Sequence, residues 1–337
     1  MILTSRRPQV LILDERYWAA AEQLASEHSE IDLVRACDSR SSQVDVVMTQ
    51  DVPVGAELLE STNAADLVFK MGRNYSNIDL EAAKAHGVRV AFLPRKGPNC
   101  VAELATTFML ALSKDLLMQH LAVAKGAYKM RGLRPKKTDE KVMAFMWMAN
   151  ERLHEVADKT VGIIGFGEIG QEVARRARVL GMNVHYHKRT RLPDYIENQY
   201  QAVYHPDLHS LLRASDYTCV TVPQTEETVD MLGREELELI GKDGYLVNVA
   251  RGAIVDEDAL ALALHDDVIA GAALDVFVCE PLRADHPLCH LDNVILTPHV
   301  GGGTGTSPII ELERALAEVK KIVCEGADPT HLVTYGN

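Results

Sequence analysis

The stretch Thr160-Val-Gly-Ile-Ile-Gly-Phe-Gly-Glu-Ile-Gly170 decides the fold of this chain. It begins with a β-branched apolar run and leads into the helix-forming run Gln171-Glu-Val-Ala-Arg-Arg-Ala-Arg-Val-Leu180. Gly165 permits a tight exit from a strand, Gly167 lets a pyrophosphate approach the backbone, and Gly170 lets the helix lie close on the sheet. A lone G-x-G-x-x-G pattern is often just a turn, but a strand before it and a helix after it predict a dinucleotide-binding turn.

Length and composition predict a soluble α/β protein of two domains. The 337 residues exceed one ordinary domain, and 47% apolar with 25% charged residues are typical of a globular chain. No apolar run approaches the roughly 20 residues that a membrane-spanning helix needs. Arg6 and Arg7 precede only the short run Val10-Leu-Ile-Leu13, which disfavours a secretory signal. We therefore expect a cytoplasmic protein with no membrane partner.

Charge and cysteine content narrow the classes of ligand. The net charge of −13 argues against a nucleic-acid partner, so local basic groups must capture any anionic ligand. The six cysteines, at 37, 100, 219, 279, 289 and 324, include no C-x-x-C pair, which disfavours both a disulfide framework and a zinc cluster. We interpret them as small buried hydrophobes and expect no metal site.

Short β-branched runs alternate with amphipathic runs in the first hundred residues, which predicts one α/β unit. The expected strands are residues 10–13, 45–48, 67–71 and 88–92, and the expected helices are residues 15–27 and 79–86. A helical stretch from Val101 to about Ala122 has no glycine and is long enough to bridge two domains. A loop of mixed charge and methionines follows, to about Lys159.

A second α/β series begins at the glycine-rich stretch. After the first strand we expect strands at residues 183–187, 217–222, 245–249, 268–274 and 294–296, and helices at 207–213, 234–240 and 256–265. The last predicted helix, residues 307–324, has no place to pack except on the first domain or the bridging helix. We therefore expect the first domain to be discontinuous.

Three polar side chains follow strands in the second half: Arg251, Glu280 and His299. Ligands of open α/β sheets bind beyond the carboxyl ends of the strands, so all three could face one crevice. Taken singly, each has a plainer interpretation, as a solvated loop charge, a turn residue before Pro281 and a loop histidine. Together they supply a carboxylate clamp, a proton donor and a group that keeps the donor protonated, which hydride transfer to a 2-oxo acid requires.

At these residues the chain resembles the D-2-hydroxyacid dehydrogenase family, and within it the NADPH-dependent glyoxylate/hydroxypyruvate reductases most of all. The blocks that carry the resemblance follow the family's order over nearly the whole chain. They are Asn77-Ile-Asp-Leu-Glu-Ala-Ala-Lys84, Val101-Ala-Glu103, residues 161–170, Val222-Pro-Gln-Thr-Glu-Glu-Thr228, Asn248-Val-Ala-Arg-Gly-Ala-Ile-Val-Asp256, Ala273-Leu-Asp-Val-Phe277, Glu280-Pro281 and Thr297-Pro-His-Val-Gly301.

The resemblance implies an α/β fold of two Rossmann-like or flavodoxin-like domains. Each domain would have a parallel sheet with helices on both faces, and the active site would lie in the cleft between the domains. Residues 1–101 and 302–337 would form the discontinuous substrate-binding domain, and residues 102–301 the dinucleotide-binding Rossmann domain. This agrees with the packing expected for the last helix.

The resemblance also implies roles for single residues. Arg251 would bind the substrate carboxylate and carbonyl, His299 would protonate the carbonyl oxygen, and Glu280 would orient His299. Independently of the family, a free imidazole has a pKa near about 6.5, and a neighbouring carboxylate favours its charged form. Asp275 would hold the nicotinamide carboxamide. The implied coenzyme contacts are Gly165, Phe166, Gly167, Glu168, Ile169, Gly170, Lys188, Arg189, Thr190, Val222, Pro223, Thr228, Val249, Ala250, Asp275 and Gly301.

The residues His187-Lys-Arg-Thr-Arg191 predict the choice of coenzyme. They stand about 20 residues beyond the glycines, where an NAD enzyme carries an acid for the ribose 2′-hydroxyl. No acid is present there, whereas Lys188 and Arg189 can bind a 2′-phosphate and Thr190 can donate a hydroxyl. NADPH is therefore favoured over NADH. The plainer alternative is a solvated basic turn in an NAD enzyme.

In relatives, backbone amides of a glycine-rich loop also bind the substrate carboxylate, and that loop corresponds to Met71-Gly-Arg-Asn-Tyr-Ser76. The expected substrate contacts are Gly72, Arg73 and Asn74, together with Arg251 and His299. Relatives commonly carry a second glycine at the position of Asn74, a residue that tolerates a left-handed backbone. Arg73 could reach a second anionic group of the substrate, or it could simply cap the loop as an exposed side chain.

The segment Met143-Ala-Phe-Met-Trp-Met148 lies where relatives carry a loop that packs against a partner subunit. Exposed apolar side chains there would help to form a homodimer, with Trp147 near the mouth of an active site. The alternative is that the segment is buried core.

The main hypothesis is an NAD(P)-dependent reductase of a small 2-oxo acid that yields the D-2-hydroxy acid. Glyoxylate and hydroxypyruvate are the leading substrates. The alternative is a coenzyme-sensing scaffold, because transcriptional corepressors of the same family keep the Arg, Glu and His residues. Phosphite oxidation stays open, whereas formate dehydrogenase is disfavoured because that relative has Gln where Glu280 stands.

Overall fold

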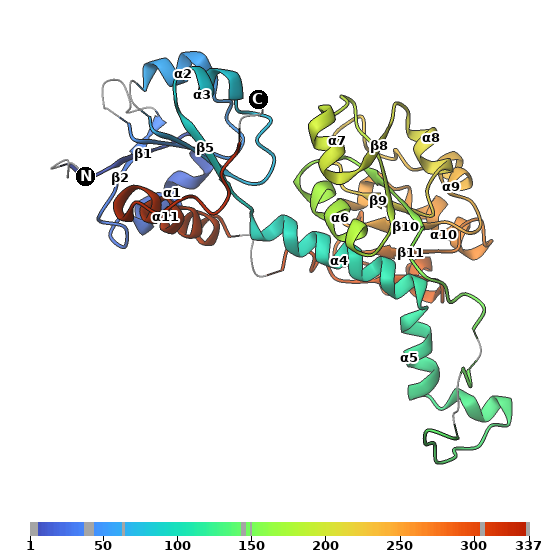
Figure 1. Ribbon diagram of the computed structural model, residues 1–337. Coiled ribbons are helices and arrows are strands. Elements are labelled where there is room, and N and C mark those ends of the chain that lie inside the picture. Colours follow the sequence, from blue (N-terminus) through green and yellow to red (C-terminus); the bar gives the residue numbers. More distant parts are fainter. Residues whose placement is uncertain are drawn as a thin grey trace. The chain divides into compact units, whose positions relative to one another are not determined.

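The computed structural model describes residues 6–36, 44–62, 65–142, 146–148, 150–303 and 307–334 (Figure 1). The chain divides into two compact units. Unit 1 comprises residues 1–99 and 302–337, and unit 2 comprises residues 100–301, so the division follows residue 99 where the sequence predicted 101. In the described part of the chain, no helix has the length and apolar character that crossing a membrane requires.

Unit 1 is built on a five-stranded parallel sheet of order β2-β1-β3-β4-β5. Its strands are β1 (Gln9–Ile12), β2 (Asp32–Arg35), β3 (Val46–Thr49), β4 (Leu67–Met71) and β5 (Arg89–Leu93). Its helices are α1 (Trp18–Leu24), α2 (Ala56–Ser61), α3 (Leu80–Ala85) and α11 (Pro308–Glu325), and a 3-10 turn at Glu15–Tyr17 precedes α1. Parallel strands are covered on both faces, which explains their short β-branched apolar runs.

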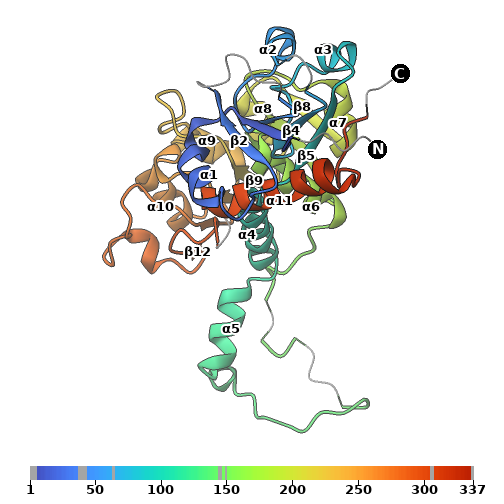
Figure 2. The same ribbon diagram turned by 90° about the vertical axis from the view of Figure 1, so that its left-hand side faces the viewer.

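Alternate residues of the strands of unit 1 point to opposite faces of the sheet. Val10 packs in one core layer with Leu24 of α1 and Leu316 of α11. Leu11, the next residue along the strand, packs in the other layer with Leu59 of α2. Figures 1 and 2 show α1 and α11 on one face of this sheet and α2 and α3 on the other. The C-terminal helix therefore completes the core of the N-terminal unit.

Unit 2 is built on a seven-stranded parallel sheet of order β12-β11-β10-β9-β6-β7-β8. Its strands are β6 (Thr160–Ile164), β7 (Asn183–His187), β8 (Ala202–His205), β9 (Tyr217–Val220), β10 (Tyr245–Asn248), β11 (Gly271–Leu274) and β12 (Val294–Leu296). Its helices are α5 (Leu116–Ala124), α6 (Glu168–Val179), α7 (Asp194–Tyr200), α8 (Leu208–Arg213), α9 (Arg234–Ile240) and α10 (Glu257–His265), and α4 (Lys96–Ser113) crosses the division at residue 99. The strand order reverses between β6 and β9.

The same alternation builds two core layers in unit 2. Ile163 of β6 packs with Phe108 of α4 and Val173 of α6. Its neighbour Ile164 packs with Leu211 of α8 and with residues of α9 and α10 (Figure 1). Two parallel sheets with helices on both faces confirm the predicted fold class.

The prediction of one helix from residue 101 to about 122 is wrong. Helix α4 ends at Ser113, and α5 begins at Leu116. Between them Asp115 takes a left-handed conformation with φ of 45°, which a right-handed helix cannot accommodate. The side-chain amide of Asn150 donates to the Asp115 carboxylate at 2.5 Å and stabilises the break.

Candidate functional site

The glycine-rich turn between β6 and α6 is shaped by close contacts. Gly165 has φ of +88°, and a Cβ there would lie 2.6 Å from Cγ1 of Val222. A Cβ on Gly170 would lie 2.3 Å from the carbonyl oxygen of Gly165, so α6 packs on the turn as only glycine allows. Gly167, in contrast, has nothing within 4 Å of the place of its missing Cβ. The turn therefore leaves an open, backbone-lined place that fits a pyrophosphate group.

The N-terminus of α6 faces the same place. Gly167 is its N-cap, and in the described residues no side chain caps this end. The positive end of the helix dipole is thus available to an anion. The Phe166 ring is fully buried, with its centroid 4.6 Å from that of Tyr186 and 5.6 Å from that of Tyr200. Phe166 can therefore offer only its backbone to a ligand.

The loop after β9 lies beside this turn, because the strand order reverses between β6 and β9. The hydroxyl of Thr221 donates to the carbonyl oxygen of Gly165. In the following loop, Oγ1 of Thr228 accepts from the Thr225 N–H at 2.7 Å and donates to the Pro223 carbonyl oxygen at 2.9 Å. Open α/β sheets bind ligands at such a reversal.

The turn after β7 carries basic side chains. Burial and the neighbouring charge of Arg189 lower the pKa of Lys188. Arg191 is engaged elsewhere, since it donates to the Glu197 carboxylate at 2.9 and 2.7 Å. Lys188, Arg189 and Thr190 are the side chains of this turn that the sequence predicted as coenzyme contacts.

His299 and Glu280 are 19 residues apart in sequence and form a hydrogen bond of 2.7 Å between Nδ1 and Oε2. Oε1 of Glu280 accepts from the Phe277 N–H at 3.1 Å, which fixes the carboxylate. The bond to His299 holds the pKa of Glu280 below its ordinary value, although burial opposes this. The His299 side chain is 44% exposed. With Nδ1 engaged, Nε2 is left to carry a proton toward a ligand.

Arg251 follows β10, and hydrogen bonds within residues 248–251 stabilise the turn that carries it. Nη1 of Arg251 donates to the Ala250 carbonyl oxygen at 2.6 Å. Asn248, which is 1% exposed, accepts from the Ala250 N–H at 3.0 Å and donates to the Arg251 carbonyl oxygen at 2.9 Å. Val249 and Ala250 are buried. Asn248 is a positioning residue that the sequence did not reveal, because a strand-end asparagine carries no signal of its own.

The loops that carry Arg251 and Glu280 touch through their backbones. A Cβ on Gly252 would lie 1.9 Å from the carbonyl carbon of Phe277. The charge of Arg251 contributes to the lowered pKa of Glu280, so the guanidinium acts on the same pair. The structure thus brings Arg251, Glu280 and His299 together at the carboxyl ends of β10, β11 and β12.

Asp275 follows β11 directly and is 1% exposed. Its carboxylate accepts from the backbone N–H groups of Val300, at 2.8 Å, and Gly301, at 2.7 Å. It also accepts from the hydroxyl of Thr297. Asp275 and Gly301, both expected to contact the coenzyme, are therefore bonded to each other.

A cavity of about 570 Å³ opens beside His299 and Glu280. Most of its lining is apolar. The other residues that line it are Phe277, Pro281, Leu282, Cys289, Leu296, Thr297 and Pro298. A cavity of this volume accommodates a small organic ligand.

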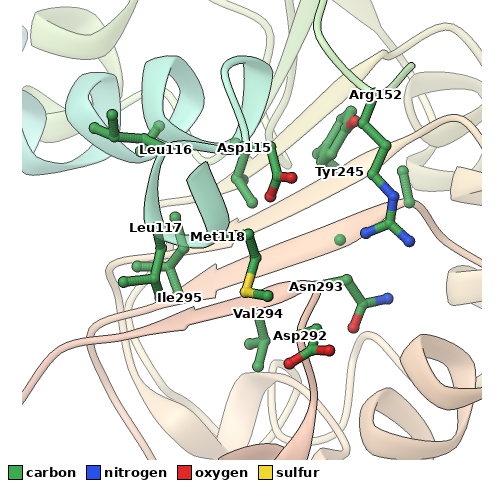
Figure 3. A pocket seen from close by; sticks show the side chains of 14 residues that line it. Asp115, Leu116, Leu117, Met118, Arg152, Tyr245, Asp292, Asn293, Val294 and Ile295 are labelled. Carbon is green, nitrogen blue, oxygen red and sulfur yellow. The ribbon is translucent and has the colours of Figure 1, made fainter. Parts of the chain in front are cut away.

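A second depression lies at the opposite ends of the strands (Figure 3). Its lining includes Tyr245, Gly271 and Val294, the first residues of β10, β11 and β12, and Figure 3 shows Arg152 reaching into it. Its volume of about 30 Å³ holds roughly one water molecule. This depression is therefore no site for a coenzyme or an organic acid.

The loop after β4 in unit 1 holds Gly72, Arg73 and Asn74. Among these, the positive φ falls on Gly72, at 120°, and Asn74 does not take the left-handed conformation that its type tolerates. Asn74 instead accepts from the Ser76 N–H at 3.1 Å through its side-chain oxygen. The guanidinium carbon of Arg73 lies 5.8 Å from the centroid of the Phe92 ring.

Part of the segment 143–148 can be placed. Residues 143–145 lie outside the described residues. Met146 and Trp147 are 49% and 39% exposed, so these two side chains are not buried core in the single chain. The Trp147 ring meets the Tyr128 ring edge-on, with centroids 6.1 Å apart.

Comparison with known proteins finds relatives that are named as enzymes. Residues 108–301 match the family model described as D-isomer specific 2-hydroxyacid dehydrogenase, NAD binding domain. A glyoxylate reductase from Thermococcus gammatolerans is 38% identical over 252 residues, which cover 74% of this chain and 71% of that protein. A glyoxylate reductase from Aeropyrum pernix is 32% identical over 341 residues, which cover 97% and 96%.

Solved structures agree with this match. The NADPH-dependent glyoxylate/hydroxypyruvate reductase from Sinorhizobium meliloti, in complex with NADP and malonate, aligns with a TM-score of 0.53. Its sequence is 26% identical, and the alignment covers 98% of this chain and 97% of that chain. The likeness therefore extends over both units and is not confined to residues 108–301.

Proposed function

The chain belongs to the D-isomer specific 2-hydroxyacid dehydrogenase family, and from this premise we propose that it reduces a small 2-oxo acid to the D-2-hydroxy acid. It is an oxidoreductase that uses a nicotinamide coenzyme. The 2.7 Å bond between His299 and Glu280, beside Arg251, is the observation that carries the proposal. Glyoxylate and hydroxypyruvate are the leading substrates, because the relatives are named glyoxylate reductases. A cytoplasmic location stays a prediction from the sequence.

Each residue of the proposed site has one task in the reaction. Arg251 binds the substrate carboxylate and carbonyl oxygen through charge-assisted hydrogen bonds. A nicotinamide coenzyme, when bound, would supply the hydride that the carbonyl carbon accepts. His299 donates the proton on Nε2 to the carbonyl oxygen as the C=O π bond opens, and it takes a proton back from solvent. Glu280 holds Nδ1 and balances the positive charge of the ring.

The coenzyme is proposed to bind to residues 100–301, with the pyrophosphate at the glycine turn and the nicotinamide near Asp275. Besides Arg251 and His299, backbone amides of residues 72–74 are proposed to contact the substrate, on its carboxylate. Arg73 is proposed to bind a second anionic group where the substrate has one. Glyoxylate has no such group.

Consumption of NADPH with a panel of oxo acids tests the function. We expect turnover with glyoxylate and hydroxypyruvate, and the D enantiomer wherever the product is chiral. Coenzyme binding without turnover of any oxo acid would contradict the proposal and favour a scaffold related to the corepressors of the family. Turnover of phosphite instead would assign a phosphite dehydrogenase.

We further propose that NADP is preferred, with Lys188, Arg189 and Thr190 on its 2′-phosphate. The Arg189→Ala variant is expected to have a KM for NADPH about tenfold higher, because one charge-assisted bond is lost. Its KM for NADH should stay within about twofold, because NADH has no such phosphate. Arg191→Ala is the matched control, since that side chain is bonded to Glu197. A wild-type KM for NADPH above that for NADH would reverse the assignment.

We also propose a homodimer formed through α5 and the segment that follows it. Helix α5 has the largely apolar sequence LLMQHLAVA, yet none of its residues is buried in the single chain. Leu116 is 57% and Val123 is 54% exposed, and Met146 and Trp147 extend the apolar surface. Figure 2 shows α5 pointing away from the sheet of unit 2. Apolar side chains gathered on such an element are typical of a subunit interface.

The variant Leu116→Asp is expected to be a monomer, because a charge at the centre of an apolar interface is strongly unfavourable. Light scattering after size exclusion, at micromolar concentration, measures the mass. Leu262→Asp is the control, since Leu262 on α10 is 64% exposed and lies outside the proposed interface. A wild-type protein that runs as a monomer, or a Leu116→Asp variant that stays dimeric, would contradict this interface.

A further inference from the structure

The turn that carries His299 has a constrained backbone. His299 has φ of 53°, a left-handed conformation that residues with a Cβ keep only when their surroundings impose it. Its own N–H donates to the Thr297 carbonyl oxygen at 3.0 Å. Because the side chain is 44% exposed, packing around the imidazole does not hold this conformation. The residues on either side of His299 must do so.

Asp275 bonds to both sides of that turn. Oδ1 accepts from the Thr297 hydroxyl and from the Val300 N–H at 2.8 Å, and Oδ2 accepts from the Gly301 N–H at 2.7 Å. Asp275 is itself anchored, because its N–H donates at 3.0 Å to the carbonyl oxygen of Asn248 in β10. The buried carboxylate thus ties residues before and after His299 to the carboxyl ends of β10 and β11.

We propose that Asp275 is a positioning residue for proton transfer, whose carboxylate fixes the turn 297–301 and so keeps the His299 imidazole against Glu280. This rests on the proposed function in that His299 is taken as the proton donor. A carboxylate has about four acceptor sites, and the turn occupies three of those on Asp275. The turn is therefore the main partner of Asp275, and a contact with the nicotinamide would be secondary.

The Asp275→Asn variant separates the two roles. An amide NH₂ cannot accept the hydrogen bonds that one carboxylate oxygen accepts, so the turn loosens. We expect kcat for oxo-acid reduction to fall about 30-fold, with the KM for NADPH within about twofold of wild type. The alkaline limb of the pH profile should move to lower pH, because a displaced imidazole loses its carboxylate partner. Glu280 and Arg251 are the charged groups of this site, and the charges of His299 and Arg251 both lower the pKa of Glu280.

Thr297 offers a matched pair of variants. Thr297→Val removes the hydroxyl that donates to Asp275, and Thr297→Ser keeps it. We expect Val to lower kcat about tenfold with the same downward shift of the pH profile, and Ser to restore kcat to within about twofold. If circular dichroism shows that Asp275→Asn does not fold, this pair decides the question alone. Equal kinetics of the Val and Ser variants would overturn the proposal.

An NMR titration tests the positioning of His299 without measuring turnover. The titration midpoint of the His299 ring can be followed by NMR in the coenzyme-free protein and assigned with His299→Gln. We expect it to fall by about one pH unit in Asp275→Asn. An unchanged midpoint and kcat, with the KM for NADPH raised more than about tenfold, would make Asp275 a coenzyme contact and overturn the proposal. If the wild type reduces no oxo acid but the midpoint falls as expected, the proposed function fails while the positioning of His299 by Asp275 stands.

Discussion

The His299→Ala variant is expected to lose about 10³- to 10⁴-fold in kcat for 2-oxo acid reduction, while its Kd for NADPH stays within about twofold. Without the imidazole no group delivers a proton to the carbonyl oxygen as its negative charge develops. The proposed coenzyme contacts at the glycine turn and the basic turn do not involve the His299 side chain, so we expect the substitution to leave them intact. Steady-state kinetics and fluorescence titration with NADPH measure the two effects.

His265 provides the control for this variant. It is an exposed histidine of the same unit, and its Nδ1 bonds the Asp266 carboxylate at 2.8 Å, much as His299 bonds Glu280. His265→Ala is expected to keep wild-type kcat. Full activity in His299→Ala would remove His299 from the mechanism, and equal losses in both variants would point to a general effect on folding.

The Glu280→Gln variant is expected to lose about 100-fold in kcat at neutral pH. In its pH profile, the midpoint of the alkaline decline in kcat should fall by about 1–2 pH units. In the proposed mechanism reduction requires a protonated His299, and a neighbouring carboxylate favours a charged imidazole. A neutral amide supports the same geometry without the charge. The imidazole therefore loses its proton at lower pH, and less of the active form is present at pH 7.

The lowered pKa of Glu280 decides which residue each limb of the pH profile of kcat reports on. The hydrogen bond from His299 holds this pKa below its ordinary value, so the carboxylate is ionised wherever the imidazole titrates. In the proposed mechanism, the loss of activity on the alkaline side of the pH profile then reports the deprotonation of His299. On the acid side the pair persists until the pH falls through the lowered pKa of Glu280.

The Asp266→Asn variant controls for a change in any exposed histidine–carboxylate pair, since it removes the charge beside His265. We expect its pH profile to match the wild type. A Glu280→Gln variant whose profile coincides with that of the wild type would refute the role of Glu280.

The central strands are the predictable part of the fold. Burial on both faces requires continuous apolar runs, and β4 and β6 show them. Strands β2 and β8 are not predicted because polar residues such as Asp32 and His205 interrupt their apolar runs, which their partial exposure allows. Helices α2 and α7 are also missed, and neither begins with a side-chain N-cap such as Asp79 of α3 or Asp207 of α8.

The break at Asp115 shows why boundaries are harder to predict than elements. The composition around it is helical throughout, and the left-handed residue is held by Asn150, 35 positions along the chain. A contact of that separation leaves no local pattern in the sequence.

The candidate site, like the fold, is only partly predictable from the sequence. Arg251, Glu280 and His299 could be named from the sequence because each follows a predicted strand. Their arrangement depends on backbone atoms, such as the Phe277 N–H that fixes Glu280 and the Val300 N–H that binds Asp275. Backbone groups are common to all residues, so one sequence does not reveal which of them are used.

The close approach of Gly252 to Phe277 sets a boundary for laboratory evolution of this enzyme. Any side chain at position 252 forces apart the two loops that hold the guanidinium and the carboxylate. In a random library, inactive clones should therefore accumulate at that codon whatever amino acid replaces glycine.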